Sequence, residues 1–244
     1  MSIKVLVNGA FGRMGQMTIK AIANHSGLEI VGQTGRDYDL KQAIKDSSAE
    51  VVVDFTHPNA VFKNACTIIE SGARPVIGTS GLTQEEVQQL QHQCHAAKLG
   101  GIIAPNFSLG AVLMMKYAKE IAKWMPHVEI IEMHHDKKAD SPSGTAMRSA
   151  EMLAEMMTPN TSATTITREN VPGARGAQYH GIPIHAIRLP GFLAHQQIIF
   201  GNQGETLTLR HDSLDRQCFM PGVCLACEKV MSLDQLVYGL DEIL

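Results

Sequence analysis

The segment that most constrains the fold lies near the start of the chain, where a short β-rich run leads into glycines and then into a helical pattern. Residues 3–7 are followed by Gly9-Ala10-Phe11-Gly12-Arg13-Met14-Gly15, and helical spacing of apolar residues continues to Ile22. Glycines let the backbone approach a pyrophosphate closely, and N–H groups at a helix start meet its charge. We therefore expect a dinucleotide site at Gly9, Ala10, Phe11, Gly12, Arg13 and Met14. Because the spacing is G-x-x-G-x-x-G, a helix-entry turn of an unrelated α/β protein is the alternative.

Up to residue 104, short β-rich runs alternate with longer helical patterns. The runs cover residues 3–7, 28–32, 51–55, 75–77 and 101–104. Strands separated by helices predict a parallel sheet, and such sheets bind ligands beyond the carboxyl ends of their strands. The loops there are further candidates, although their residue types also suit ordinary turns. They read Asp54-Phe55-Thr56-His57, Gly78-Thr79-Ser80-Gly81 and Ala104-Pro105-Asn106-Phe107.

After a helix expected over residues 109–125, strands follow strands. They are expected at residues 128–134, 184–189, 194–200 and 205–211, with a hairpin turn at 201–204. The predicted fold class is α/β, with a Rossmann-like dinucleotide-binding domain and an α+β domain containing a mixed or antiparallel sheet. We assign residues 1–106 and 218–244 to the first domain, on which a helix at 220–231 packs. Residues 107–217 form the substrate-binding and oligomerisation domain, and residues 159–179 read as a long surface loop.

Charge and cysteine content exclude several classes of protein. The formal net charge is −3, from 21 basic and 24 acidic residues, and the basic residues are scattered, so no nucleic-acid partner is expected. No apolar run is long enough to span a membrane, and the first residues contain no secretory apolar core. Five cysteines, an odd number in a chain able to build a core, favour a reducing cytoplasm without a disulfide framework.

The segment with the most chemistry joins the strand at residues 128–134 to a helix. It reads Glu132-Met133-His134-His135-Asp136-Lys137-Lys138-Ala139-Asp140-Ser141-Pro142-Ser143-Gly144-Thr145. The helical pattern that follows predicts a helix beginning near Ser143, which offers the N–H groups of Ser143, Gly144 and Thr145 to an anion. Lys138 can pair with the same anion, and a histidine can donate a proton near neutral pH. We therefore expect an acidic substrate and a proton donor.

Other interpretations of these residues stay open from the pattern alone. Adjacent residues of a strand point to opposite faces, so one of His134 and His135 can be purely structural. Neither this segment nor residues 92–95 has two separated pairs of ligands at zinc spacing, so no metal is expected. Cys224 and Cys227 lie on an apolar helical pattern, which fits core packing better than redox chemistry.

Taken together, these motifs resemble those of the bacterial dihydrodipicolinate reductase family, also called 4-hydroxy-tetrahydrodipicolinate reductases, along nearly the whole chain. The most specific of them is Asp140-Ser141-Pro142-Ser143-Gly144-Thr145-Ala146. The resemblance implies reduction of the cyclic product of dihydrodipicolinate synthase to tetrahydrodipicolinate with NADH or NADPH, on the route to diaminopimelate and lysine. It also implies a homotetramer.

The resemblance assigns roles position by position. His134 matches the family's acid/base residue and Lys138 its proton donor, while His135, Gly144 and Thr145 match substrate contacts. Cofactor contacts fall on the glycine turn and on Gly78, Thr79, Ser80, Ala104, Pro105, Asn106 and Phe107. The residue chemistry agrees, because hydride delivery to an unsaturated ring builds negative charge that a positioned acid neutralises.

Two other functions compete with this one. The first is another nicotinamide oxidoreductase with two domains, such as an amino-acid or semialdehyde dehydrogenase. A semialdehyde dehydrogenase needs a cysteine nucleophile at a strand end, and no cysteine here matches. The second is a non-catalytic dinucleotide sensor, which would need neither a proton donor nor an anion site.

The end of the second strand bears on the form of the cofactor. Chains that bind NAD normally place a carboxylate there for the ribose 2′-OH, but this sequence reads Thr34-Gly35-Arg36-Asp37, with Gly35 at that position. Arg36 is then expected to bind a 2′-phosphate through its guanidinium group. The alternatives are that Asp37 takes the NAD role or that Arg36 is a solvated turn residue. We expect NADPH to be accepted at least as well as NADH.

Overall fold

A computed structural model describes residues 2–157 and 168–244 of the chain. It divides into two compact units, one formed by the residues up to Leu109 together with Arg216–Leu244, and the other by Gly110–Asp215. The boundaries expected from the sequence, after residue 106 and before residue 218, lie within three residues of these divisions.

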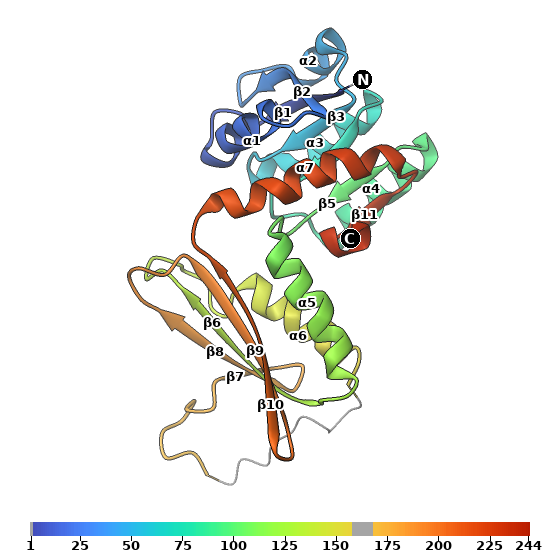
Figure 1. The fold of residues 1–244 in the computed structure, drawn as a ribbon. Helices are drawn as coiled ribbons and strands as arrows, with labels where there is room; N and C mark the ends of the chain where they lie inside the picture. The colour runs from blue at the N-terminus through green and yellow to red at the C-terminus, as the bar shows by residue number, and fades with distance from the viewer. Residues whose placement is uncertain (1, 158–167) are drawn as a thin grey trace. The chain divides into compact units, whose positions relative to one another are not determined.

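The first unit contains a six-stranded parallel sheet in the order β11-β5-β4-β3-β1-β2 (Figure 1). The order reverses between β1 and β3, which is where sheets of this kind bind ligands. The central strands are fully buried valine- and isoleucine-rich runs, because helices cover both faces. The strands are β1 (Ile3–Asn8), β2 (Leu28–Thr34), β3 (Val51–Asp54), β4 (Arg74–Ile77), β5 (Gly101–Ile103) and β11 (Leu236–Tyr238).

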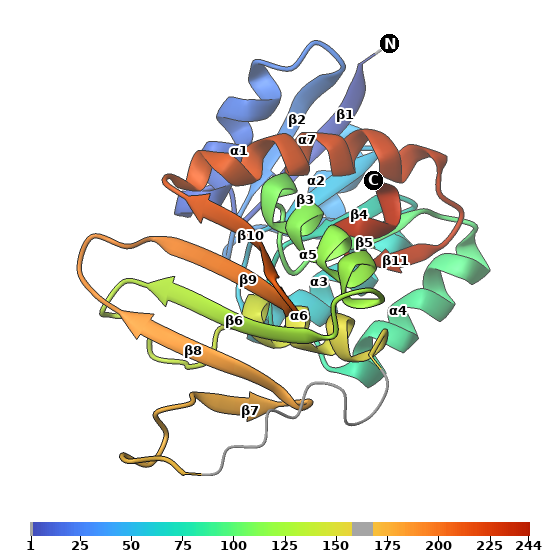
Figure 2. The same cartoon turned by 60° about the horizontal axis from the view of Figure 1, so that its bottom comes forward.

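Five helices flank this sheet. On one face, α2 (Leu40–Ser47), α3 (Pro58–Glu70) and α4 (Gln84–Ala97) share an apolar cluster with the sheet. On the other face, α1 (Arg13–Ala23) packs against α7 (Met220–Lys229) (Figure 2). Two local sequence signals mark these helix starts: Pro58 occupies the first turn of α3, and Thr83 and Glu86 form a capping box at the start of α4.

The end of the chain returns to the first unit. Helix α7 lies against α1, and β11 adds to the edge of the sheet beside β5. Gly222 makes this packing possible, because a Cβ there would lie 2.0 Å from the carbonyl oxygen of Phe107. The sequence reading missed β11 and α2, which are too short for periodicity to reveal.

The second unit combines a five-stranded sheet with the helices α5 (Leu109–Ala122) and α6 (Gly144–Ala154). Its strand order is β10-β9-β6-β8-β7. Strands β6 and β8 are parallel, because the chain passes through α6 between them, whereas the other neighbours are antiparallel. The α/β class with a mixed second sheet is therefore confirmed. The strands are β6 (His127–His134), β7 (Ala177–Tyr179), β8 (Ile182–Arg188), β9 (Ala194–Asn202) and β10 (Glu205–Ser213).

One face of the second sheet carries the core of that unit. Val128, Ile130 and Phe200 are among the sheet residues that pack there against both helices. Because side chains alternate along a strand, the same face of β6 continues from Ile130 to Glu132 and His134 at its carboxyl end. The hydrophobic pattern that builds the core thus also directs these two polar side chains.

The loop expected at residues 159–179 lies partly outside the described residues. Its last three residues form β7, which pairs with β8, so a structureless loop is wrong for that part. Within the described ranges, no helix is long and apolar enough to cross a membrane.

Candidate active site

The carboxyl end of β6 holds a buried carboxylate next to a histidine. The side chain of Glu132 has no exposed surface, and that of His134 is 14% exposed. The two residues are separated by one position and lie on the same face of the strand, so Nδ1 of His134 reaches Oε2 of Glu132 at 2.6 Å. An ionised carboxylate accepts a hydrogen bond from the protonated Nδ1, which leaves Nε2 as the ring nitrogen able to exchange a proton with a ligand.

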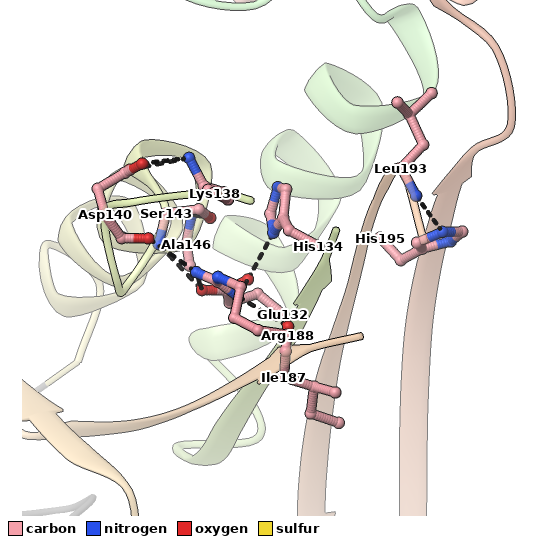
Figure 3. Close-up of polar contacts among 10 residues, drawn as sticks. All are labelled: Glu132, His134, Lys138, Asp140, Ser143, Ala146, Ile187, Arg188, Leu193 and His195. Atoms are coloured by element: carbon pink, nitrogen blue, oxygen red, sulfur yellow. Dashed lines mark hydrogen bonds and ion pairs between the residues drawn. The ribbon is translucent and has the colours of Figure 1, made fainter. Parts of the chain in front are cut away.

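Arg188 is the second cationic partner of the Glu132 carboxylate. It stands opposite His134 in the parallel pairing of β6 with β8. Its two terminal nitrogens donate to the two oxygens of Glu132 at 2.7 and 2.8 Å (Figure 3). The same nitrogens also donate to the carbonyl oxygens of Ile187 and Asp140. A bidentate pair of this kind fixes the carboxylate in position.

The partners of Glu132 also keep it charged. Burial raises the pKa of this carboxyl group, but the hydrogen bonds from His134 and Arg188, with their positive charges, outweigh burial and bring the pKa to about 2. At neutral pH the carboxylate is therefore ionised, and it holds the His134 ring in one orientation.

Helix α6 begins beside this cluster, but it offers fewer N–H groups than the sequence indicated. Ser143 caps the helix: its hydroxyl accepts from the N–H of Ala146 at 3.2 Å, and its own N–H donates to Glu132 Oε1 at 3.1 Å. The expectation that the Ser143 N–H is offered to an anion is therefore wrong. Among the described residues nothing accepts from the N–H groups of Gly144 and Thr145, and these form the open end of the helix.

Lys138 lies in the loop between β6 and α6 and is paired with a carboxylate. Its Nζ lies 2.7 and 2.8 Å from the two carboxylate oxygens of Asp140, and this hydrogen bond lowers the pKa of Asp140. The Asp140 side chain is 62% exposed, so a stronger anionic partner can replace it at little cost. His135, just beyond the end of β6, is half-buried.

The second unit thus gathers three kinds of group around one loop. It has a cationic amine at Lys138, open N–H groups at Gly144 and Thr145, and a proton-exchanging nitrogen on His134. Lysine and helix N–H groups bind carboxylates, and an oriented imidazole transfers protons. The arrangement can bind an acidic molecule and protonate it.

In the first unit, the glycine turn after β1 has the geometry of a pyrophosphate cradle. Gly9 has a φ of 81°, and a Cβ there would lie 2.3 Å from the carbonyl oxygen of Phe55. At Gly15 a Cβ would lie 2.2 Å from the carbonyl oxygen of Gly9, so this glycine lets α1 pack closely on the turn. Neither position tolerates a side chain.

The start of α1 is open to an anion. Gly12 caps the helix without any side-chain hydrogen bond, and the first turn contains no acidic residue. Ala10 donates its N–H to Thr34, so Ala10 has none to offer. Within the described residues the N–H groups of Phe11, Arg13 and Met14 have no acceptor, and these fit the charge of a pyrophosphate.

Asp54, at the end of β3, organises the neighbouring loops. This carboxylate is fully buried, and the hydrogen-bond donors it meets among the described residues are neutral. Its Oδ2 accepts from the side-chain amides of Asn8 and Asn64 at 2.8 and 2.9 Å. Its Oδ1 accepts from the hydroxyls of Thr79 and Thr56, at 2.6 and 2.7 Å, and from the N–H of Thr56 at 3.1 Å. The carboxyl ends of β1, β3 and β4 are thereby tied together.

This network engages the Thr79 side chain in the first of the next two loops. The Thr79 hydroxyl donates to Asp54 and accepts from the N–H of Thr56 at 2.7 Å. Gly78 is needed because a Cβ there would lie 2.1 Å from the Phe55 ring. Phe107 is 3% exposed and packs against Phe55. The other expected contacts lie at the same strand ends: Ser80 and Pro105 are exposed, Asn106 is half-buried and Ala104 is buried.

Arg36 follows β2 with an exposed side chain, as a group that reads a ribose phosphate requires. The Phe11 ring lies against Gly35, just before Arg36, and a Cβ at position 35 would lie 2.9 Å from that ring. The usual acidic residue at this position would therefore displace the Phe11 ring.

The cysteines do not supply a nucleophile. The structure describes all five, and none follows a strand of the parallel sheet. Burial raises the pKa of the Cys94 thiol to about 12 and also raises the pKa values of Cys224 and Cys227. Buried, protonated thiols are poor nucleophiles, which argues against a semialdehyde dehydrogenase.

Three residues of these sites were missed or given no role in the sequence reading. Glu132 had a local signal, because it lies two residues before His134 on a strand. Asp54 lies in one of the candidate strand-end loops but had no assigned role, and Arg188 had no local signal. Arg188 is 56 residues from Glu132, and Asp54 is 46 residues from Asn8, so the pairing of strands brings each of these pairs together.

Comparison with known proteins gives consistent results over the full chain. Residues 3–107 match the family model described as dihydrodipicolinate reductase, N-terminus, and residues 110–244 match the model for the C-terminus. The 4-hydroxy-tetrahydrodipicolinate reductases of Coxiella burnetii (strain Dugway 5J108-111) and Legionella pneumophila (strain Paris) are 55% and 49% identical, each over 100% of both chains.

Structural comparison gives the same family. The solved structure of dipicolinate-bound dihydrodipicolinate reductase from Paenisporosarcina sp. TG-14 has a TM-score of 0.93 and 42% identity, covering 100% of both chains. With both family models matched and the fold shared end to end, the chain belongs to the dihydrodipicolinate reductase family.

Proposed function

We propose that this protein reduces the cyclic product of dihydrodipicolinate synthase to tetrahydrodipicolinate with NADPH or NADH, in the synthesis of diaminopimelate and lysine. The observation that carries the proposal is the cluster at the end of β6, where Glu132 orients His134 beside Lys138 and the open start of α6. A relative that is 42% identical was solved with dipicolinate bound, which is a ring dicarboxylate of the expected class.

Substrate binding uses the cationic groups of the second unit. One carboxylate of the substrate accepts hydrogen bonds from the N–H groups of Gly144 and Thr145. The substrate also replaces the exposed Asp140 as the ion-pair partner of Lys138. His135, at the end of the same strand, adds a polar contact. Ser143 acts indirectly, because its N–H and hydroxyl already position Glu132 and cap the helix.

Proton transfer uses His134. The chemistry that a reduced nicotinamide supplies, when bound on the glycine turn, is a hydride for the unsaturated ring. The 4-hydroxyl of the substrate leaves as water together with one ring proton, which gives the unsaturated dihydro ring that accepts the hydride. As the ring gains the hydride, negative charge develops on it, and a proton from the site neutralises that charge. The Nδ1–H group of His134 is hydrogen-bonded to Glu132, so the proton exchanged with substrate is the one on Nε2. Lys138 stabilises the negative charge that develops on the ring and donates a proton to the substrate.

The direct test is an assay of cofactor oxidation. Adding the dihydrodipicolinate synthase product to protein and reduced cofactor should remove the nicotinamide absorbance, with NADPH and with NADH. A sensor would bind the cofactor without this loss, and an amino-acid or semialdehyde dehydrogenase would respond only to its own substrate. No loss of absorbance with either cofactor would contradict the proposal.

His134→Gln and Lys138→Ala should each reduce kcat by about 100-fold or more, the range for a lost acid or base. Cofactor affinity should change little, because both residues lie in the second unit. His135→Gln should mainly raise the substrate KM. Steady-state kinetics combined with cofactor titration measures all three effects. Near wild-type kcat in either of the first two variants would remove the proposed proton-transfer roles.

The stability that the protein loses on the substitution Glu132→Gln should depend on pH. The pKa of Glu132 falls from its ordinary 4.5 to about 2 on folding, so the carboxylate stabilises the fold fully above about pH 5 and loses this contribution as the pH falls toward 2. The difference in free energy of unfolding between wild type and variant should be largest near neutral pH, with roughly 3–4 kcal/mol from titration alone. Denaturant unfolding at successive pH values measures it, and parallel profiles would rule out this linkage.

Arg36→Ala should weaken NADPH binding selectively, by roughly 1.5–3 kcal/mol, as for a lost charged hydrogen bond. NADH lacks the 2′-phosphate and should bind the variant almost as well as it binds wild type. Titration of both proteins with both cofactors decides the matter. Equal loss of affinity for the two cofactors would show that Arg36 does not read the 2′ position.

The protein should be a homotetramer joined through the second sheet. In the described part of that unit both helices pack on one face, while the other face carries Ile131, Ile187 and Ile199 among polar residues. Open sheet faces and edges need to be covered, which favours subunit contact there. Sedimentation or light scattering at micromolar concentration should give four subunits, whereas a stable monomer would contradict the proposal.

A further inference from the structure

Two exposed aromatic side chains lie against each other in the first unit. Phe11, in the glycine turn after β1, is 57% exposed, and Tyr38, in the loop after β2, is 54% exposed. Their rings are stacked, with centroids 5.7 Å apart and an angle of 30° between the planes. In the other pair of aromatic rings at this edge, Phe107 is buried and Phe55 is half-buried. A large apolar surface left open to water in this way indicates a contact that the protein makes with something else.

The local backbone builds this surface around a glycine. Strands β1 and β2 are neighbours, and Asn8 pairs with Thr34 at their carboxyl ends, so the two loops emerge side by side. The Phe11 ring fills the space beside Gly35, where a Cβ would lie 2.9 Å from it. The N–H of Tyr38 donates to the carbonyl oxygen of Gly35 at 3.2 Å, which turns the chain back toward Phe11. We call Phe11, Gly35 and Tyr38 the aromatic shelf.

The neighbours of the aromatic shelf define its ligand. No acceptor among residues 2–157 and 168–244 meets the N–H groups of Phe11, Arg13 and Met14 at the start of α1, and the side chains of Arg13 and Arg36 are exposed. An anion site next to a flat aromatic surface fits a nucleotide, whose phosphate and base need these two environments. In sheets of this type the adenosine ribose lies at the end of the second strand, which is where Tyr38 follows.

We infer that the aromatic shelf binds the adenine ring of the dinucleotide by stacking, with Tyr38 as an affinity-determining residue. The inference rests on the proposed cofactor site. Adenine is common to NADH and NADPH, so the aromatic shelf strengthens both equally, while Arg36 distinguishes between them. The same inference explains the glycine at position 35. The Phe11 ring lies where the usual ribose-binding carboxylate side chain would begin, and base stacking replaces the hydrogen bonds that the carboxylate would make.

The test is equilibrium titration of the full-length protein with NADH, NADPH and 2′,5′-ADP, which carries the adenosine end without nicotinamide. Tyr38→Ala should raise the Kd of all three by about tenfold, the size expected for one stacked base. Tyr38→Phe keeps the ring and should bind them as wild type does. The matched control is Tyr117→Ala on α5, since Tyr117 is 58% exposed, and this variant should leave all three Kd values unchanged.

The outcomes separate this inference from the proposed function. If wild type binds the dinucleotides and Tyr38→Ala binds all three ligands equally well, the aromatic shelf does not hold adenine, although the cofactor site stands. Weaker dinucleotide binding with unchanged 2′,5′-ADP binding would also overturn the inference, because the effect would lie away from adenosine. Wild type that binds none of the three would overturn both. Circular dichroism of each variant confirms that a raised Kd does not come from unfolding.

Discussion

The arrangement of the proposed substrate site depends on one buried carboxylate, that of Glu132. It joins a strand, the neighbouring strand and the start of a helix, through His134, Arg188 and Ser143. A buried charge of this kind is tolerated only when its partners are in place, and removing one partner costs several kcal/mol. The same contacts that satisfy the charge also orient the imidazole and the open end of α6. Stability and preorganisation of the site therefore have a common cause.

The first unit solves a similar problem in a different way. Asp54 is as deeply buried as Glu132 but is surrounded by amides, hydroxyls and an N–H group in place of cations. Neutral donors satisfy the carboxylate oxygens without adding charge near the glycine turn. The cationic side chains of this unit, Arg13 and Arg36, remain exposed at the strand ends. A cofactor that carries phosphates thus meets free positive charge and free N–H groups.

Local patterns in the sequence predict most of the fold and part of the site. The βα alternation, the capping box at Thr83 and the hairpin before Glu205 each depend on residues close together in the chain, and the structure contains all three. Contacts that depend on strand pairing cannot be predicted from local sequence patterns. The Arg188–Glu132 pair joins residues 56 positions apart, and the use of the Ser143 N–H by Glu132 removes a group that the helix start alone would offer. The crowding of Phe11 against Gly35 likewise becomes visible only in three dimensions.

In the proposed reaction, a hydride passes from the nicotinamide to a ring dicarboxylate bound beside His134 and Lys138. Isotope transfer measures this directly. Cofactor deuterated at the transferable position of the nicotinamide is incubated with the protein and the dihydrodipicolinate synthase product, and the reduced ring is examined by mass spectrometry. We expect one carbon-bound deuterium in each product molecule, with proportional oxidation of the cofactor. A reduced product that carries no deuterium from the cofactor would contradict the proposed reaction.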